Sequence, residues 1–473
     1  MEASKYLING EWRSSSAKRK VFNPYRNEPV AEVCQASAKE IDEAIQAADD
    51  AFHKTRYLSA FERSSILAST AAGIESKSEE FARLITMETG KPISFSRVEV
   101  DRSIFVLRTS SEEAKRIEGV VLPLDVVPNN AQRSAIIRRF PLGVVAAITP
   151  FNFPLNLVCH KLGPAIAAGN TVVLKPSSNA PRTALLLGEI IDSTDLPKGA
   201  INIVPCLGGE AEQLITDKRI KMLSFTGSPV VGWGIKVRAG RKRVALELGG
   251  NAAVIVAPDA DMEYALKRIV QGAFGNAGQS CISVQRIYVH ESIADLFTDQ
   301  LVKMTRSIAV GDPTNERTVV GPMIDEHAAR TVESWIAEAA ASGARILCGG
   351  TRKGAVLEPT VMADVDPAMK VSCQEVFAPV VTVDRYTDFA DAVRRVNASS
   401  FGLQAGIFTN NAADVFHAYR ELEVGGVIVN DSSSYRMDHM PYGGVKESGF
   451  GREGIRYAIE EMMEMKLLAL NFP

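Results

Sequence analysis

The chain has 473 residues, which is more than one hydrophobic core accommodates and therefore predicts at least two domains. Its residues are 46% hydrophobic and 23% charged, as is typical of a soluble globular protein. The formal net charge of −3 gives no reason to expect a nucleic-acid partner or an anionic membrane surface, and no apolar run approaches the ~20 residues that span a bilayer.

Long helical patterns dominate the first part of the chain. An alanine-rich helix is predicted over 37–52, and helical patterns continue over 61–89 and 97–116, with a break at Gly90-Lys91-Pro92. The character then changes, because prolines and asparagines separate short β-rich pieces over 119–140. We predict a protruding hairpin in this region.

Strands and helices alternate from Leu142 onwards. Continuous apolar strands of this kind predict a parallel sheet that is covered by helices on both faces. The predicted strands are 144–148, 171–176, 201–204, 222–225 and 244–248, and the helices between them include 155–168 and 181–191. Because ligands bind beyond the carboxyl ends of such strands, residues 149–152, 175–178 and 225–228 should meet Glu247 in one crevice.

A second alternating series follows and predicts a second α/β unit. Its strands are expected at 253–256, 286–290, near 346, 361 and 380, and at 406–408 and 427–430, with helices at 262–274, 293–307 and 326–342. The tail, 462–472, is extended and apolar. An unpaired apolar strand aggregates readily, so we expect this tail to pair with another sheet, in a partner subunit.

Cysteines and histidines are widely dispersed, with no CxxC pair, no disulfide framework and no cluster of metal ligands. This usage predicts a reducing, cytoplasmic setting and no metal site. The polar start of the chain, residues 1–12, does not resemble a signal or transit peptide. The basic run 238–243 is interpreted as a solvated connection.

One cysteine stands apart from the others. Cys281 lies in a turn of small residues, where Gly278 carries no Cβ and the backbone can approach a substrate closely. Glu247 ends an apolar run upstream, and Asn152 follows another such run. A thiol nucleophile, a carboxylate base and a side-chain amide are the groups that chemistry at a carbonyl carbon requires. The remaining cysteines are predicted to be structural, namely Cys34, Cys159, Cys206, Cys348 and Cys373.

Seven motifs, in order and at similar spacing, resemble the aldehyde dehydrogenase superfamily over essentially the whole chain. They are ITPFNFPL (148–155), LKPSS (174–178), SFTGSPVVG (224–232), LELGGN (246–251), GQSC (278–281), EVFAPV (375–380) and PYGGVKESGFGREG (441–454). The resemblance implies an α/β fold with a Rossmann-like coenzyme domain, an α/β catalytic domain and a β oligomerisation segment. These domains would cover 1–118 with 141–247, then 248–445, and finally 119–140 with 455–473. A homodimer or homotetramer is implied as well.

The resemblance also implies a mechanism. Cys281 would attack the aldehyde as a thiolate and give a thiohemiacetal, while the Asn152 amide and the backbone N–H of Cys281 bind the oxyanion. Loss of hydride to a nicotinamide leaves a thioester, and Glu247 would activate water to hydrolyse it, or would deprotonate Cys281 earlier.

A set of coenzyme contacts follows from the same motifs. They are Thr149, Pro150, Phe151, Lys175, Ser177, Ser178, Gly227, Ser228, Val231, Leu248, Gly249, Glu375 and Phe377. The helix that opens at Gly227 and Ser228 would direct its N-terminus at the pyrophosphate. NAD-preferring members often have glutamate where this chain has Ser178. Serine admits the 2′-phosphate of NADP without requiring it, so NAD and NADP both stay open.

Five residues are candidates for substrate contacts: Arg108, His160, Ser280, Ile282 and Arg436. Arginines at positions 108 and 436 resemble those of members that act on phosphorylated, phosphonate or carboxylated aldehydes, since guanidinium suits such anions. Ser280 replaces an arginine of several semialdehyde-oxidising relatives, and a small hydroxyaldehyde such as lactaldehyde stays open.

Two other functions compete with hydrolytic aldehyde oxidation. A coenzyme-A-acylating semialdehyde dehydrogenase typically lacks the glutamate at position 247, so Glu247 speaks against that reading. A catalytically silent structural protein on the same scaffold would have lost the nucleophile or the base, whereas Cys281 and Glu247 are both present.

Overall fold

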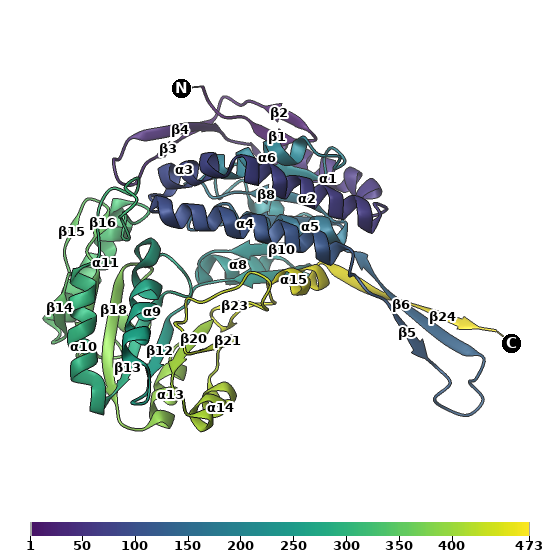
Figure 1. The fold of residues 1–473 in the computed structure, drawn as a ribbon. Coiled ribbons are helices and arrows are strands. Elements are labelled where there is room, and N and C mark those ends of the chain that lie inside the picture. Colours follow the sequence, from purple (N-terminus) through teal and green to yellow (C-terminus); the bar gives the residue numbers. More distant parts are fainter. Residues whose placement is uncertain (1, 473) are drawn as a thin grey trace.

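The computed structural model describes residues 2–472 and contains two α/β bodies and a projecting β arm (Figure 1). The purple and teal half of the chain forms one body, and the green part forms the other. Each body is built on a largely parallel sheet. This arrangement agrees with the predicted α/β class, whereas the residue boundaries of the domains stay a prediction.

Within the described residues, the sheet of the first body has eight strands in the order β2-β1-β9-β8-β7-β10-β11-β23. The five strands from β9 to β11 are parallel, and β7 and β8 are buried along most of their length because helices cover both faces. The strands are β1 (Tyr6–Ile8), β2 (Glu11–Arg13), β7 (Val144–Ile148), β8 (Thr171–Lys175), β9 (Ile201–Ile203), β10 (Ile220–Thr226), β11 (Arg243–Glu247) and β23 (Gly449–Phe450).

The helices of the first body begin where the sequence supplies caps. Ser37 and Glu40 form a reciprocal capping box at the start of one helix, and Ser59 and Glu62 form another. The helical pattern predicted over 61–89 is two helices, because Lys77 leaves the helical region at φ −116° and ψ 21°. The helices are α1 (Ala38–Thr55), α2 (Ala60–Ser76), α3 (Ser78–Thr89), α4 (Ile93–Ala114), α5 (Asn156–Ala168), α6 (Pro181–Asp192), α7 (Glu212–Thr216), α8 (Pro229–Arg238) and α15 (Ile455–Glu461).

The second body carries a sheet in the order β14-β17-β18-β13-β12-β20-β21, parallel except at β14. Its strands are β12 (Ala252–Val256), β13 (Val284–His290), β14 (Arg345–Cys348), β17 (Thr360–Ala363), β18 (Val380–Tyr386), β20 (Gln404–Phe408) and β21 (Gly426–Val429). The helices are α9 (Met262–Phe274), α10 (Glu291–Arg306), α11 (Glu326–Ala341), α12 (Lys370–Cys373), α13 (Phe389–Asn397) and α14 (Ala412–Glu421), and the short helix η1 (Gly275–Gly278) follows α9. Two-stranded pairs complete the chain: β3 (Lys18–Phe22) with β4 (Pro29–Cys34), β15 (Arg352–Lys353) with β16 (Val356–Leu357), and β19 (Phe401–Gly402) with β22 (Val445–Lys446).

The projecting arm is a three-stranded sheet in the order β24-β6-β5 (Figure 1). Its strands are β5 (Val120–Pro123), β6 (Arg133–Pro141) and β24 (Met463–Asn471), so the hairpin predicted over 119–140 is present. The tail, expected to pair with another sheet, pairs antiparallel with β6 of its own chain over nine residues, and pairing of its other edge with a partner subunit stays a prediction. This pairing satisfies the backbone groups on one side of β24, which is an edge strand of the arm.

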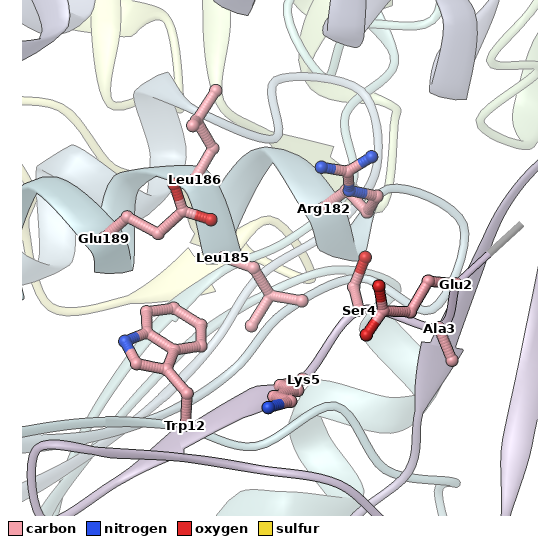
Figure 2. Close-up of a pocket in the computed structure, with 9 residues that line it drawn as sticks. All are labelled: Glu2, Ala3, Ser4, Lys5, Trp12, Arg182, Leu185, Leu186 and Glu189. Atoms are coloured by element: carbon pink, nitrogen blue, oxygen red, sulfur yellow. The ribbon is translucent and has the colours of Figure 1, made fainter.

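A hollow of about 450 Å³ lies where the N-terminal residues pack against α6 (Figure 2). Trp12 and Leu185 face it, and Lys5, Arg182 and Glu189 surround it. None of the predicted site residues lines this hollow. Across residues 2–472, no helix combines the length and the apolar character that a bilayer crossing requires.

Candidate active site

A cavity of about 520 Å³ lies beyond the carboxyl ends of β7, β10 and β11, where the loop before β13 reaches the first body. Cys281, Glu247 and Asn152 all line it, although 129 residues separate the first from the last in the chain. Other predicted site residues line the same cavity: Pro150, Phe151, Gly227, Ser228, Leu248, Gly249, Ser280, Ile282, Glu375, Phe377 and Arg436.

The turn that carries Cys281 is held by close backbone contacts. Asn276 and Ala277 are both left-handed, at φ 53°, and Gly278 follows at φ 68°. A Cβ on Gly278 would lie 2.1 Å from the carbonyl oxygen of Ala378, and one on Gly250 would lie 2.0 Å from that of Cys281. Because both glycines lack a side chain, the nucleophile turn packs directly against two other loops.

Asn152 reaches the same turn from the loop between β7 and α5. Its Nδ2 donates a hydrogen bond to the carbonyl oxygen of Gln279 at 3.0 Å, which fixes the amide plane. Its Oδ1 has no hydrogen-bond partner within residues 2–472. The amide nitrogen carries two N–H groups and uses one of them for Gln279, so the other is available to an oxygen bound beside Cys281.

A buried ion pair anchors the Asn152 loop. Glu99 on α4 accepts hydrogen bonds from the backbone N–H groups of Leu155 at 2.9 Å and Asn156 at 3.2 Å, and its other oxygen pairs with Lys91. Both side chains are buried, and Lys91 Nζ lies 3.9 Å from the centre of the Phe153 ring. The loop that carries Asn152 is thus tied to the first body by charge as well as by packing.

Replacing Glu99 by glutamine should destabilise the protein by about 3–5 kcal/mol, because Lys91 is then left buried without a carboxylate. The midpoint of guanidinium unfolding measures this loss. Glu79→Gln is the matched control, since the Glu79 pairs with Arg83 and Arg97 are exposed and should be worth less than about 1 kcal/mol. Equal shifts for the two variants would contradict the anchoring role of Glu99.

Glu247 ends β11 and is 4% exposed. Burial raises the pKa of its carboxyl well above the ordinary value, and the charge of Glu453 raises that pKa further. Glu247 Oε2 has no hydrogen-bond partner in the described part of the chain. The group is therefore a weaker acid and a stronger base than an exposed glutamate, and it has a free oxygen for water.

Glu453 is a second buried carboxyl group near Glu247, but its pKa is shifted in the opposite direction. Its Oε1 lies 3.2 Å from Lys161 Nζ, and its Oε2 lies 3.2 Å from a guanidinium nitrogen of Arg436. Burial opposes its charge, but Lys161 and its cationic neighbours hold the pKa of Glu453 down, to about 2. The sequence analysis missed Glu453 and Lys161, although Glu453 lies within the PYGGVKESGFGREG motif.

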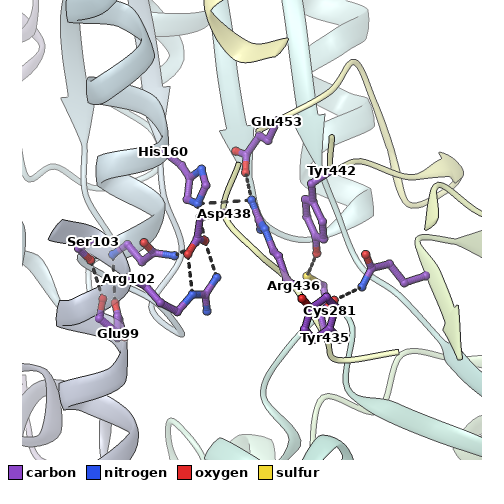
Figure 3. A network of polar contacts seen from close by, with 12 residues as sticks. Glu99, Arg102, Ser103, His160, Cys281, Tyr435, Arg436, Asp438, Tyr442 and Glu453 are labelled. Atoms are coloured by element: carbon purple, nitrogen blue, oxygen red, sulfur yellow. Dashed lines mark hydrogen bonds and ion pairs between the residues drawn. The ribbon is translucent and has the colours of Figure 1, made fainter. Parts of the chain in front are cut away.

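Arg436 and Tyr442 are stacked beside the nucleophile (Figure 3). The guanidinium of Arg436 lies 3.6 Å from the centre of the Tyr442 ring, and Tyr442 Oη lies 3.0 Å from Cys281 Sγ. Burial raises the pKa of the Cys281 thiol to about 12, whereas the hydrogen bond with Tyr442 lowers it. Tyr442 was also missed, although it lies in the same PYGGVKESGFGREG motif.

The predicted substrate contacts need two corrections. Arg108 does not line the cavity, since its side chain is 55% exposed and pairs with Glu75 at 2.7 Å. Arg102 lines it instead, because six residues on an α-helix place two side chains about 120° apart. His160 does not line the cavity either and is buried behind the lining residues. Its Nε2 lies 2.8 Å from Asp438 and 3.5 Å from Arg436 (Figure 3).

Asp438 contacts both Arg102 on α4 and His160 on α5. It binds Arg102 through both oxygens, at 2.9 and 2.6 Å, and it contacts His160 through one of them. Burial and the nearby Arg436 charge lower the pKa of His160, so its imidazole is neutral at pH 7. Residues missed by sequence reasoning that also line the cavity are Arg102, Phe153, Asn156, Leu157, Thr226, Ser434, Tyr442 and Glu453.

The coenzyme side of the cavity fits a nicotinamide dinucleotide. The N-terminus of α8 opens at Ser228, which makes no side-chain cap, so its backbone N–H groups are available to an anion. A Cβ on Gly249 would lie 2.5 Å from Glu375 Oε2, so a side chain at this position would require the Glu375 carboxylate to move. Glu375 accepts from Gly250 N at 2.8 Å, and burial raises its pKa to about 7.

The remaining predicted coenzyme contacts lie outside the cavity lining. They are Thr149 after β7, Lys175 at the end of β8, Ser177 and Ser178 before α6, and the half-exposed Val231 on α8. Burial lowers the pKa of Lys175. In residues 2–472, no group of three histidine, cysteine, aspartate or glutamate side chains is placed to hold a metal ion.

Comparisons with known proteins agree with this geometry. A sequence model of the aldehyde dehydrogenase family matches residues 12–468. The chain is 48% identical over 465 residues to a 3-sulfolactaldehyde dehydrogenase of Priestia megaterium, covering 98% of this chain and 97% of that protein. The structure of aldehyde dehydrogenase 21 from Physcomitrella patens, in complex with the reaction product succinate, is 43% identical with a TM-score of 0.98, covering 99% and 98% of the two chains. A glyceraldehyde-3-phosphate dehydrogenase of Methanocaldococcus jannaschii, complexed with NADP, is 39% identical with a TM-score of 0.93, covering 97% and 100%.

Proposed function

Because the chain belongs to the aldehyde dehydrogenase family, we propose that it oxidises a small anionic aldehyde to the carboxylic acid with NAD or NADP. The observation that carries the substrate class is Arg436, whose side chain is 7% exposed and lines the cavity that also contains Cys281. Relatives named for 3-sulfolactaldehyde, succinate and glyceraldehyde-3-phosphate support this class, since each name denotes an acidic group on a short carbon chain.

The catalytic groups act in sequence on the carbonyl carbon. The Cys281 thiolate forms a C–S bond with the aldehyde, and the carbonyl π electrons move to oxygen, where Asn152 donates a hydrogen bond. A bound nicotinamide coenzyme supplies the hydride acceptor, and the product on Cys281 is a thioester. Glu247 then takes a proton from water as that water attacks the thioester, and the acid leaves as Cys281 regains its electron pair.

The charges around the cavity favour an anion. Arg102, Arg436 and Lys161 are three cations, and Asp438 and Glu453 are the two carboxylates that pair with them. These five groups together carry one net positive charge. Arg436 Nε has no hydrogen-bond partner within residues 2–472. A sulfonate, phosphate or carboxylate on the substrate would neutralise this excess and could accept from that N–H.

Arg436→Leu should lower kcat/KM for 3-sulfolactaldehyde relative to lactaldehyde by about 30-fold or more, since truncating one member of a buried charge pair costs about 2–5 kcal/mol. The ratio of the two specificity constants is the readout, because general damage to the site cancels in it. Arg108→Leu is the matched control and should leave the ratio unchanged, since Arg108 is exposed on the far side of α4. An unchanged ratio in Arg436→Leu would refute the anion site.

Two further features bear on the choice of coenzyme and on the assembly of subunits, namely Ser178 and the projecting arm. Ser178 carries no charge that would repel a 2′-phosphate, so NADP is accepted beside NAD. The arm exposes apolar side chains, among them Val121, Leu467 and Leu468, and we infer that they are covered in a homodimer or homotetramer in the cytoplasm. Glu247 argues against transfer of the acyl group to coenzyme A, because a water-activating base serves hydrolysis.

A further inference from the structure

Tyr442 presents its phenol to the reacting sulfur. Its Oη lies 3.0 Å from Cys281 Sγ. Within the part of the chain that the structure describes, this is the one hydrogen bond that a side chain makes to that sulfur. In Figure 3 the tyrosine ring descends between Glu453 and Cys281, with Arg436 alongside it. The side chain is 4% exposed and packs with Ile282 and Leu403. This contact is not explained by the thiol, carboxylate and amide chemistry described above.

The position of the phenol is fixed by two kinds of contact. The Arg436 guanidinium lies 3.6 Å from the centre of its ring, which is a cation–π geometry. The backbone of Tyr442 exchanges hydrogen bonds with Glu453, at 2.9 Å from Tyr442 N and 2.6 Å from Glu453 N. A hydroxyl that is clamped in this way cannot turn away from the sulfur without breaking the stack.

The direction of the hydrogen bond follows from the protonation states. Burial raises the pKa of Tyr442 well above its ordinary value, so the phenol keeps its proton. A thiolate has no proton and can only accept. Once Cys281 is ionised, Tyr442 must therefore be the donor, in a charge-assisted hydrogen bond that is stronger than a neutral one.

We propose that Tyr442 is a further catalytic residue, which donates a hydrogen bond to the Cys281 sulfur whenever that sulfur carries negative charge. The inference rests on the proposed function for its role in turnover. In the first step, which starts from the Cys281 thiolate, the sulfur electron pair forms the C–S bond, the carbonyl π electrons move to oxygen, and the phenol is released from a sulfur that is no longer charged. During hydrolysis the C–S bond breaks, its electron pair returns to sulfur, and the phenol donates again to the departing thiolate.

The hydroxyl group, rather than the ring, carries this role. Phenylalanine at position 442 would fill the same volume and keep the stack under Arg436, but it has no proton to donate. Tyr442→Phe therefore separates hydrogen bonding from packing. Tyr435→Phe is the matched control, because Tyr435 lies in the same loop region with a 39% exposed side chain and makes no such contact.

The test is the pH dependence of iodoacetamide alkylation, followed on the Cys281 peptide by mass spectrometry in the intact protein without aldehyde or coenzyme. Tyr442→Phe should raise the apparent pKa of Cys281 by about one unit and slow its alkylation at neutral pH about tenfold. Tyr442→Met, which also lacks a donor, should shift the pKa in the same direction. Tyr435→Phe should match the wild type.

The outcomes separate this inference from the proposed function. A Tyr442→Phe protein whose Cys281 titrates and alkylates as in the wild type overturns the inference, whatever the enzyme oxidises. A raised thiol pKa in a protein that oxidises none of the anionic aldehydes supports the Tyr442 contact and refutes the substrate class. In turnover, a charge-assisted hydrogen bond that acts on the sulfur should show its loss in kcat more than in KM.

Discussion

Cys281→Ala should abolish aldehyde-dependent reduction of NAD and NADP, with kcat lower by at least about 10⁴-fold. Hydride leaves readily only from a tetrahedral adduct, and alanine offers no atom that can form one. Nicotinamide absorbance under saturating aldehyde and coenzyme measures the loss.

Cys373→Ala is the control for this variant, because Cys373 is a partly exposed thiol on α12. It should retain wild-type turnover, which would show that thiol loss in general is harmless. Coenzyme binding, followed by quenching of protein fluorescence, should persist in Cys281→Ala, since the predicted coenzyme contacts include residues on β8, α8 and the Glu375 loop and do not include Cys281. Turnover by Cys281→Ala above a few per cent of the wild type would assign the nucleophile to another residue.

Much of the fold could be predicted because its signals are local and repeated. Apolar strands such as 144–148 and 171–175 alternate with helices, and each alternation restates the same parallel architecture. The break at Lys77 was missed, because one residue outside the helical region barely disturbs a periodic pattern. The tail was recognised as a strand, but its partner β6 lies more than 300 residues earlier, and no local pattern encodes such a pairing.

The site was predictable where one residue carries one reaction step. Cys281, Glu247 and Asn152 each follow a strand or a turn whose end must face the crevice, so sequence position and role coincide. Arg102, Lys161 and Tyr442 were missed for a different reason. Their importance comes from what they touch, namely Asp438, Glu453 and Cys281, and helix periodicity alone does not say which of several polar faces meets a distant loop.

Arg108 shows most clearly which feature of the site the sequence alone does not predict. Both Arg102 and Arg108 lie on α4, and both would suit an anionic substrate by chemistry. Only the rotation of the helix about its axis distinguishes them, and this is set by the packing of its apolar face, which includes Val100, Ile104 and Leu107, against the first body. A helix that is polar on several faces therefore predicts a charge near the site without saying which residue provides it.

Glu247→Gln should lower steady-state turnover by about 10²- to 10⁴-fold while the first turnover survives. Glutamine cannot take a proton from water, so hydrolysis stalls after the thioester has formed. Rapid mixing should then give a burst of one reduced coenzyme per site, and mass spectrometry should find the acyl group on the Cys281 peptide. Glu464→Gln, which alters an exposed carboxylate paired with Arg243, should leave both phases unchanged.

The pH dependence of the wild type gives the same assignment a second test. Burial raises the pKa of Glu247, so the carboxyl is protonated below that pKa and serves as a base only above it. Turnover should accordingly rise with pH through the raised pKa and fall as the pH drops below it, and Glu247→Gln should lose this limb. If the burst disappears together with turnover, Glu247 acts before the thioester forms, as the base that ionises Cys281, and hydrolysis must then draw its proton acceptor from elsewhere in the cavity.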